Sequence, residues 1–251
     1  MSSIVISIGV LALAFGGALL GAILATRLPK HHLSDDNKEV VKLAMALVGT
    51  LTGITLGLLI GSAKTYYDMQ SSELTQLSAN VALLGNILRG YGPEANQAHE
   101  SLRLAVERVL EENWPNDRAA NRKPSTKSVH IEEVYEQIRA LAPKDEDHQM
   151  LKSEAMGQLR NVAQLRWLII EQTSATILKP MLIVMVLWIT TIFFSWGLFS
   201  RPNPISLTTF FVVAFCVSGA IFLILELYTP YEGVLHLSSA PLRIAYDSLG
   251  R

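Results

Sequence analysis

The sequence predicts an all-α integral membrane protein with four transmembrane helices and a helical bundle inserted between the second and third of them. Two observations support this prediction: the chain has four long uncharged runs, and a charged segment of helical periodicity separates the second run from the third. A run of about 20 apolar residues is long enough to cross the roughly 30 Å hydrocarbon core of a bilayer. The four runs are Ile4–Ala25, Leu43–Ala63, Pro180–Ser200 and Pro202–Leu225.

These runs divide the chain into four parts. We assign 1–65 to transmembrane helices one and two, 66–178 to a soluble helical bundle or stalk, 179–227 to transmembrane helices three and four, and 228–251 to a C-terminal tail with a short amphipathic helix. The first run lacks the positive n-region of a signal peptide and exceeds its usual apolar length, so we expect it to be retained. The formal net charge of −1 argues against nucleic acid as a partner.

Glycine recurs at every fourth residue of the second run, at Gly49, Gly53, Gly57 and Gly61. Glycine costs a helix roughly 1 kcal/mol relative to alanine in water, but in lipid small residues let two helix backbones approach closely. The repeat therefore predicts a helix-packing face. Two partners are open: the small residues of the first run within one subunit, which we favour, or a subunit interface or pore. Thr50 lies beside this glycine stripe as a pore-helix candidate, although the threonines of the run do not share one face.

Beyond the second run the chain is charged, slightly acidic and periodic. Apolar residues take the a and d positions of a heptad pattern, with Gln70 as the polar exception. These residues, called the heptad seam below, are Tyr67, Leu74, Leu77, Val81, Leu84 and Leu88. Ser34 is a suitable N-cap, and nothing interrupts the helix before the sequence GYGPE at 90–94. One helix is therefore predicted from about Asp35 to Arg89.

Three further helices are predicted in the charged segment, because apolar residues recur there at helical spacing. They carry Ala98–Leu110, Ile131–Leu141 and Leu151–Ile169. A polar loop at 114–128 and the turn APKDED separate them. No strand pattern competes with this interpretation, so the soluble part is expected to be a helical bundle.

The tail after the fourth run has its own punctuation. Glu226 is expected to end the fourth membrane helix, and Pro230 with Gly233 predicts a turn. Ser239 followed by Pro241 predicts the start of a short amphipathic helix, because proline is tolerated in a first turn.

A search for catalytic and cofactor motifs finds none, so we expect neither an enzyme nor a bound cofactor. His31, His32, Asp35 and Asp36 contain metal-ligating groups, but adjacent residues rarely converge on one ion without further ligands. We favour a solvated loop that ends in a helix cap at this place. No metal site is therefore predicted.

Ionisable residues at membrane depth are functional candidates by default. Lys64, Lys179, Glu171 and Glu226 instead stand at helix ends, where a headgroup contact is less costly. Of these, Lys64 and Glu226 are the candidate pore-mouth or membrane-edge charges. The positive-inside rule does not decide the orientation, because five Lys and Arg residues lie near the membrane on each side.

Four blocks of the sequence resemble the bacterial bestrophin-like membrane proteins, whose domain has no assigned function. The blocks are LPKHHLSDDNKEVVKLA (28–44), LGLLIGSAK (56–64), QLSANVALLGNILRGYGPEA (76–95) and IFLILELYTPYEGVLHLSSAPLRIA (221–245). An aspartate often stands in the last motif where this chain has Tyr228. The resemblance covers nearly the whole chain in several ordered blocks.

The resemblance links the chain to bestrophins, which are pentameric anion channels with four membrane helices and a large cytosolic helical region. It implies a homo-oligomer, a pentamer by resemblance, in the bacterial inner membrane, with the bundle and both termini in the cytoplasm. It also implies that the second helix surrounds the pore and that small inorganic ions are partners beside the lipid bilayer. The acidic calcium clasp and the aromatic pore neck of animal bestrophins have no match here, so calcium gating is not carried over.

Two functional hypotheses remain. The first is an oligomeric ion channel, for anions, whose pore is lined by the second helix and whose mouth carries a ring of Lys64. The second is a non-conducting membrane-anchored scaffold or signalling protein that acts through its helical bundle, with the heptad seam as a dimerisation or partner surface. A closed ring of subunits favours the channel, whereas a monomer or dimer favours the scaffold.

Overall fold

A computed structural model describes residues 3–27, 35–114, 131–173, 179–200, 203–231 and 233–250. Within these residues every regular element is a helix and no strand occurs, which confirms the predicted all-α class. The chain divides into two compact units. The first, called the membrane unit, contains 1–67 and 176–235, and the second, called the polar unit, contains 68–175 and 236–251.

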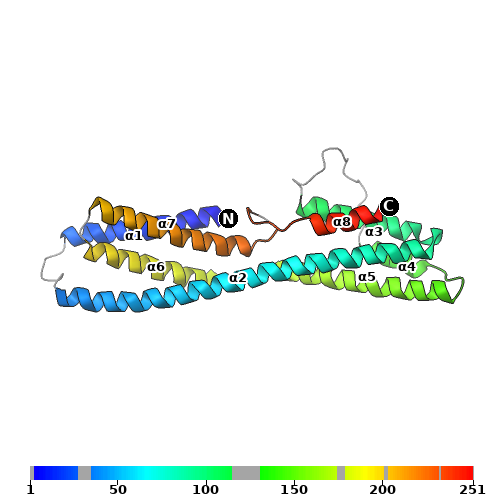
Figure 1. Ribbon diagram of the computed structural model, residues 1–251, viewed down its shortest axis with the longest axis horizontal. Coiled ribbons are helices and arrows are strands. Elements are labelled where there is room, and N and C mark those ends of the chain that lie inside the picture. The colour runs from blue at the N-terminus through cyan, green and yellow to red at the C-terminus, as the bar shows by residue number, and fades with distance from the viewer. Residues whose placement is uncertain are drawn as a thin grey trace. The chain divides into compact units, whose positions relative to one another are not determined.

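The membrane unit holds the four predicted membrane helices, which Figure 1 draws in blue, cyan and yellow to orange. They are α1 (Ser3–Arg27), the first part of α2 (Asp35–Tyr91), α6 (Lys179–Phe199) and α7 (Pro204–Leu227). Each is long and apolar enough to cross a bilayer, which confirms the four uncharged runs as candidate spans. Asn203 accepts a hydrogen bond from the backbone N–H of Ser206 at 2.7 Å and so caps the start of α7.

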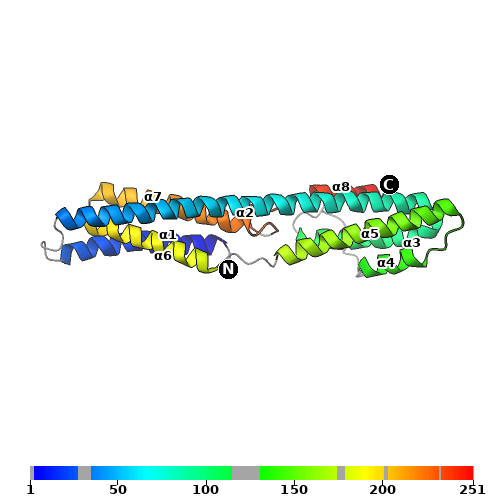
Figure 2. The same ribbon diagram turned by 90° about the horizontal axis from the view of Figure 1, so that it is seen from below.

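Within the membrane unit, α1 packs against both α6 and α7, and Figures 1 and 2 show the three helices side by side. Their shared core consists of small and medium apolar side chains. It contains Val10, Ala14, Ala18, Ile189, Phe193, Ala214, Ile221 and Leu225. One polar bond crosses the core, because the Ser218 hydroxyl donates to the carbonyl of Ser7 at 2.6 Å. Such a bond satisfies a hydroxyl that would otherwise face hydrocarbon.

The helix α2 is continuous over 57 residues, which confirms the single long helix predicted from about Asp35 to Arg89. It ends at Tyr91, because Gly92 adopts a φ of 105°, a left-handed conformation that glycine tolerates best. The predicted N-cap Ser34 and the metal-ligating candidates His31 and His32 lie outside the described residues. The side chains of Asp35 and Asp36 also lie outside them.

The heptad seam is buried along the part of α2 that belongs to the polar unit. Leu74, Leu77, Val81, Leu84 and Leu88 are all buried, and Gln70 is buried with them. The periodicity in the sequence therefore marks a core-facing stripe of this chain. The scaffold hypothesis used this seam as a free partner surface, and in that respect it is wrong, because the chain's own side chains cover the seam.

The remaining elements of the polar unit follow the predicted order. They are η2 (Pro93–Ala95), α3 (Asn96–Asn113), α4 (Ile131–Ala140), α5 (Glu146–Thr173) and α8 (Ala240–Leu249). The loop predicted at 114–128 falls outside the described residues after Trp114. Val134 and Ile138 of α4 are fully buried, and α4 packs against both α3 and α5.

The C-terminal helix α8 docks through one face, as its predicted amphipathic pattern requires. Its buried residues are Leu242, Ala245, Tyr246 and Leu249. Arg89 donates to the carbonyl of Ser248 at 2.7 Å, which satisfies an otherwise open carbonyl at the end of the helix. Arg103 donates to the hydroxyl of Tyr246 at 3.1 Å. The tail is therefore an integral part of the polar unit.

Candidate functional site: the second membrane helix and its ends

The glycine stripe of α2 makes no close contact with the rest of the described chain. A Cβ atom built on any of Gly49, Gly53, Gly57 or Gly61 meets no atom within 4 Å outside its own helix backbone. The favoured expectation, that this stripe packs on the first membrane helix within one subunit, is therefore wrong. The surface left by these glycines is open in the single chain.

The small residues that do bring helices together lie on α1 and α6 instead. A Cβ atom built on Gly21 would lie 2.1 Å from the carbonyl oxygen of Phe194, and one built on Gly197 would lie 1.9 Å from that of Ala18. These distances leave no room for a side chain, so the two backbones approach as small residues in membrane helices permit. The glycines of the first run thus pair with α6, a partner that their spacing does not identify.

The membrane part of α2 has two apolar faces. One packs inside the membrane unit, where Ala63 lies in a core cluster with Ile224 and Leu227 of α7. The other carries large aliphatic side chains at spacings of three and four residues, each exposed by 46–69%. These are Val40, Leu43, Leu47, Leu51, Ile54 and Leu58. We call this set the aliphatic stripe.

The burial of α2 differs from that of the other candidate spans. In the most apolar 18-residue window of α2, 6% of the residues are buried, against 33–39% in the windows of α1, α6 and α7. A helix with so little intramolecular cover contacts either lipid or another protein chain along most of its surface. Because α2 also carries the open glycine stripe, it is the membrane helix with the largest unused packing surface.

The hydroxyl groups along α2 are turned back onto their own helix. Thr50 donates to the carbonyl of Ala46 at 2.9 Å, and Thr52 donates to that of Val48 at 2.7 Å. Thr50 is exposed and Thr52 is buried, so the two occupy different faces, as the sequence indicated. Neither hydroxyl is directed along a common polar track in the single chain.

Aromatic and polar side chains meet where α2 and α7 leave the apolar core. The hydroxyl groups of Ser62 and Tyr228 lie 3.2 Å apart, and the rings of Tyr66 and Tyr228 lie 5.4 Å apart between centroids. Tyrosine favours the boundary between hydrocarbon and water, because its ring is apolar and its hydroxyl is polar. Lys64 is exposed at the same level of α2. The composition of this cluster is typical of a membrane edge.

Glu226 stands in the last turn of α7 and is only 2% exposed. Its Oε2 atom accepts hydrogen bonds from the backbone N–H groups of Val234 at 2.6 Å and Leu235 at 3.1 Å. Gly233 has a φ of 94°, and a Cβ atom there would lie 2.5 Å from the same oxygen. The carboxylate therefore folds the following chain back onto the end of α7, and only glycine fits the position beside it.

The sequence was compared with models of known protein families. The bestrophin-like domain matches residues 12–242, a range that includes most of α1, all of α2, α6 and α7, and the start of α8. The chain belongs to the bestrophin-like family. No curated protein and no solved structure matched the chain in the other two comparisons.

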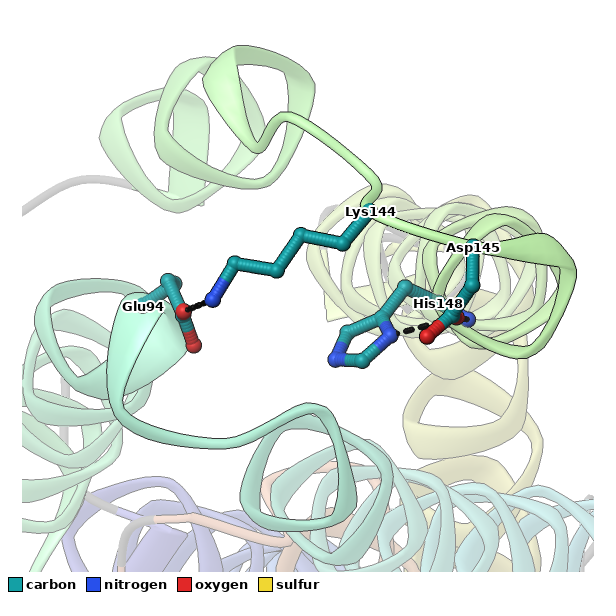
Figure 3. Close-up of polar contacts among 4 residues, drawn as sticks. All are labelled: Glu94, Lys144, Asp145 and His148. Atoms are coloured by element: carbon teal, nitrogen blue, oxygen red, sulfur yellow. Dashed lines mark hydrogen bonds and ion pairs between the residues drawn. The ribbon is translucent and has the colours of Figure 1, made fainter.

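The polar unit of this bestrophin-like chain carries a cluster of charges that Figure 3 shows. Glu94 pairs with Lys144, and Asp145 accepts hydrogen bonds from the backbone N–H of His148 at 2.9 Å and faces its Nδ1 at 2.6 Å. The ring of His148 in turn meets that of Tyr91 edge-on at 4.9 Å. Asp145 thereby caps α5, and the cluster links the end of α2 to the start of α5.

These contacts set the charge states of the two carboxylates. The hydrogen bond from Lys144 lowers the pKa of Glu94, and the hydrogen bonds from His148, the backbone N–H first, lower the pKa of Asp145. Both carboxylates are thus charged and paired at neutral pH. Among the described residues no three His, Cys, Asp or Glu side chains are grouped to hold a metal ion. The contacts of this cluster hold the end of α2 and the start of α5 together.

Sequence reasoning found some of these residues and missed others. Lys64, Glu226 and the four glycines were singled out by charge, position or spacing. The ring pair Tyr66–Tyr228 was missed, although an aromatic residue at the end of an apolar run is the usual signal of a membrane edge. Two further charges singled out from the sequence, Glu171 and Lys179, have side chains outside the described residues.

Proposed function

We propose that this bestrophin-like chain forms a ring-shaped homo-oligomer, a pentamer by family resemblance, that conducts anions along a path surrounded by α2. The proposal places the protein as a multi-pass component of a bacterial inner membrane. The polar unit, inserted between the second and third membrane helices, and both termini face the cytoplasm. We expect four helices of one subunit to be too few to enclose a wet path, so the proposed ion path requires several copies around an axis.

The main support for this proposal is that the membrane part of α2 has few contacts with the rest of the described chain. This helix has 6% of its most apolar window buried, and its glycine stripe meets no atom of the described chain. In lipid, small residues are useful where another helix approaches closely. A second copy of the chain supplies such a helix, whereas lipid chains gain nothing from the missing side chains.

The two open features of α2 suit two different neighbours in a ring. The glycine stripe is suited to the backbone of an adjacent subunit, which needs close approach. The aliphatic stripe, Val40 to Leu58, then faces lipid or the axis, where a hydrophobic constriction can gate by dewetting. Lys64, exposed at the end of the span, would form a ring of positive charge that concentrates anions at the mouth.

The decisive experiment measures oligomeric mass and ion flux on the same preparation. We expect purified full-length protein in lipid nanodiscs to have the mass of a closed ring, and liposomes that contain it to release chloride faster than empty liposomes. A monomer or dimer without flux in several salts and at several pH values would overturn the proposal and favour the membrane-anchored scaffold.

The substitution Lys64→Glu tests the anion preference separately from assembly. We expect the ratio of anion to cation permeability to fall, because the charge at the mouth changes sign. Lys42→Glu is the control, since Lys42 is also exposed on α2 but near its other end. Equal permeability ratios for wild type and Lys64→Glu would remove Lys64 from the conduction path.

A further inference from the structure

The segment Gly233–Leu235, which follows α7, presents apolar side chains outward. Val234 is 65% exposed and Leu235 is 38% exposed. No Asp, Glu, Lys or Arg occurs between Gly233 and Pro241, while Glu232 directly precedes the segment and His236 follows it. Two adjacent exposed aliphatic residues in a turn need a partner more than a single surface leucine does.

The backbone of this segment is held at the level of the last turn of α7. The Glu226 carboxylate binds the N–H groups of both Val234 and Leu235. Side chains on a helix lean toward its N-terminus, so the carboxylate lies no farther from the membrane centre than its own Cα atom. The segment therefore returns toward the membrane after the helix has ended at Leu227.

The surrounding side chains indicate which medium lies at that level. Tyr228 directly follows α7, stacks with Tyr66 and reaches the hydroxyl of Ser62. Rings with polar tips of this kind mark the zone between lipid headgroups and acyl chains. The backbone of Val234 thus lies at the last turn of α7, which is a candidate membrane span.

Glu226 also pairs two polar groups of the turn backbone. Glu226 is only 2% exposed, and Gly233 of the turn lies against its carboxylate. Its two hydrogen bonds satisfy both the charge and two backbone donors that would otherwise be unpaired in a poorly hydrated layer.

We propose that Gly233–Leu235 is a membrane-interface anchor, whose Val234 and Leu235 side chains insert into the headgroup–acyl boundary of the protein's own bilayer while Glu226 holds the turn in shape. The occupant of this surface is lipid. The anchor fixes the start of the tail to the membrane surface independently of whether the protein conducts ions, so its test does not depend on the proposed function.

Site-specific fluorescence tests the anchor in full-length protein. Cys216 is the single cysteine of the sequence, so a Cys216→Ala background allows one environment-sensitive NBD label at Val234→Cys. The matched control is Met150→Cys in α5 of the polar unit, because Met150 is 64% exposed and also apolar. Both proteins are reconstituted into phosphatidylcholine vesicles with and without nitroxide groups near the lipid headgroup.

We expect the label at 234 to emit at shorter wavelength than the label at 150 and to be quenched several-fold more strongly by the nitroxide lipid. Equal emission and equal quenching at the two positions would overturn the proposal. A blue-shifted label at 234 that the nitroxide lipid fails to quench would overturn it too, because another protein surface would then cover Val234.

The substitution Glu226→Ala in the Val234→Cys protein tests the tie. It removes the acceptor of both N–H groups, so we expect the quenching at 234 to fall toward that of the control. Unchanged quenching in a variant of wild-type mass would remove Glu226 from the role. If Glu226→Ala does not fold, Glu226→Gln replaces it, because its one amide oxygen can accept both N–H groups as Oε2 does. We expect it to retain most of the wild-type quenching, and quenching as low as that of the control would contradict the tie.

Discussion

Two helix faces in the membrane unit share a sequence pattern and differ in what covers them. On α1, glycines among alanines bring the backbone of α6 so close that no side chain fits between them, as the clash distances at Gly21 and Gly197 show. On α2, four glycines at perfect spacing meet no atom of the described chain. The spacing of small residues therefore predicts a packing surface, but it does not predict whether the partner helix belongs to the same chain.

The physical reason lies in how little a membrane helix gains from its own apolarity. All four candidate spans are apolar, so hydrophobicity cannot rank their partners, and close van der Waals contact decides. Glycines in α1 are buried by residues that lie more than 160 positions away in the sequence, such as Phe194 against Gly21. The stripe on α2 remains available for a contact of the same kind between subunits.

The largest expected effect comes from filling the occupied face. Gly21→Leu would place a Cβ atom 2.1 Å from the Phe194 carbonyl oxygen, so α1 and α6 must separate. We expect the free energy of unfolding to fall by about 3 kcal/mol or more, which is the upper range for overpacking a close contact. Thermal unfolding in detergent measures the effect as a large drop in Tm or a failure to accumulate folded protein. A Tm equal to that of wild type would show that the two helices do not approach as described.

Filling the open face should act on assembly and leave the fold intact. A Cβ atom built on Gly57 meets no atom of the described residues within 4 Å, and leucine has a higher helix propensity than glycine, so we expect the subunit Tm of Gly57→Leu not to fall. We expect the oligomer to dissociate, because the leucine blocks close approach between copies. Native mass measurement in detergent is the readout.

Gly9→Leu is the control for this prediction. Gly9 is an exposed glycine of α1 that also meets no atom within 4 Å, but it lies outside the stripe. We expect its oligomeric mass to match that of wild type. If Gly57→Leu also keeps the wild-type mass, the glycine stripe is a lipid-facing surface and the comparison between the two faces loses its functional meaning.

Much of the fold could be predicted because its signals are local. Apolar length predicted the four spans, heptad spacing predicted the apolar stripe from Leu74 to Leu88, and the sequence GYGPE at 90–94 predicted the end of α2. The candidate site was harder. Lys64 and Glu226 stand out as charges at helix ends, yet no local pattern shows that Glu226 binds backbone groups eight and nine residues later. That contact depends on how the turn folds after α7.

Tertiary partners explain the rest of the difference. The interaction of Tyr228 with Ser62 joins residues 166 positions apart, so the hydroxyl that faces Ser62 is invisible to a pattern search. The same holds for Arg89 and Arg103, which read as ordinary surface charges but contact α8 across the polar unit. Sequence periodicity indicates which side chains are buried. Only the folded structure shows which residues they contact.

In the polar unit, Gly85 of α2 also lies against another helix, and the titratable side chain of His99 lies near it. A Cβ atom on Gly85 would lie 2.1 Å from the end of the Leu249 side chain of α8 and 3.8 Å from Nε2 of His99, a buried atom for which the described residues supply no hydrogen-bond partner. Burial, and next the charge of Arg89, lowers the pKa of His99, while Glu100 raises it and Arg103 lowers it. The folded protein therefore favours neutral His99.

A lowered histidine pKa fixes the sign of the pH effect. The unfolded chain binds the proton more readily, so the stabilisation is complete above the ordinary pKa of about 6.5 and is lost as the pH falls toward the folded pKa. We expect the Tm of wild type to decline slightly between pH 7 and pH 5, and the Tm of His99→Gln to decline less over the same range. Parallel declines in the two proteins would show that His99 does not titrate at the α8 contact.

The smallest expected effect is a gain, at an open glycine in the middle of a soluble helix. Gly157 lies within α5 and meets no atom within 4 Å, so an added methyl group clashes with nothing. Alanine is favoured over glycine inside a helix by about 0.5–1 kcal/mol, because glycine loses more backbone entropy on folding. Gly157→Ala should therefore raise the Tm by about 1–4 °C, with unchanged oligomeric mass. Replacement of the open Gly157 is thus expected to change stability only. Replacement of the open Gly57 is expected to disrupt the oligomer. A loss of oligomer in Gly157→Ala would show that α5 also carries a subunit contact and that open glycines in this chain mark interfaces in both units.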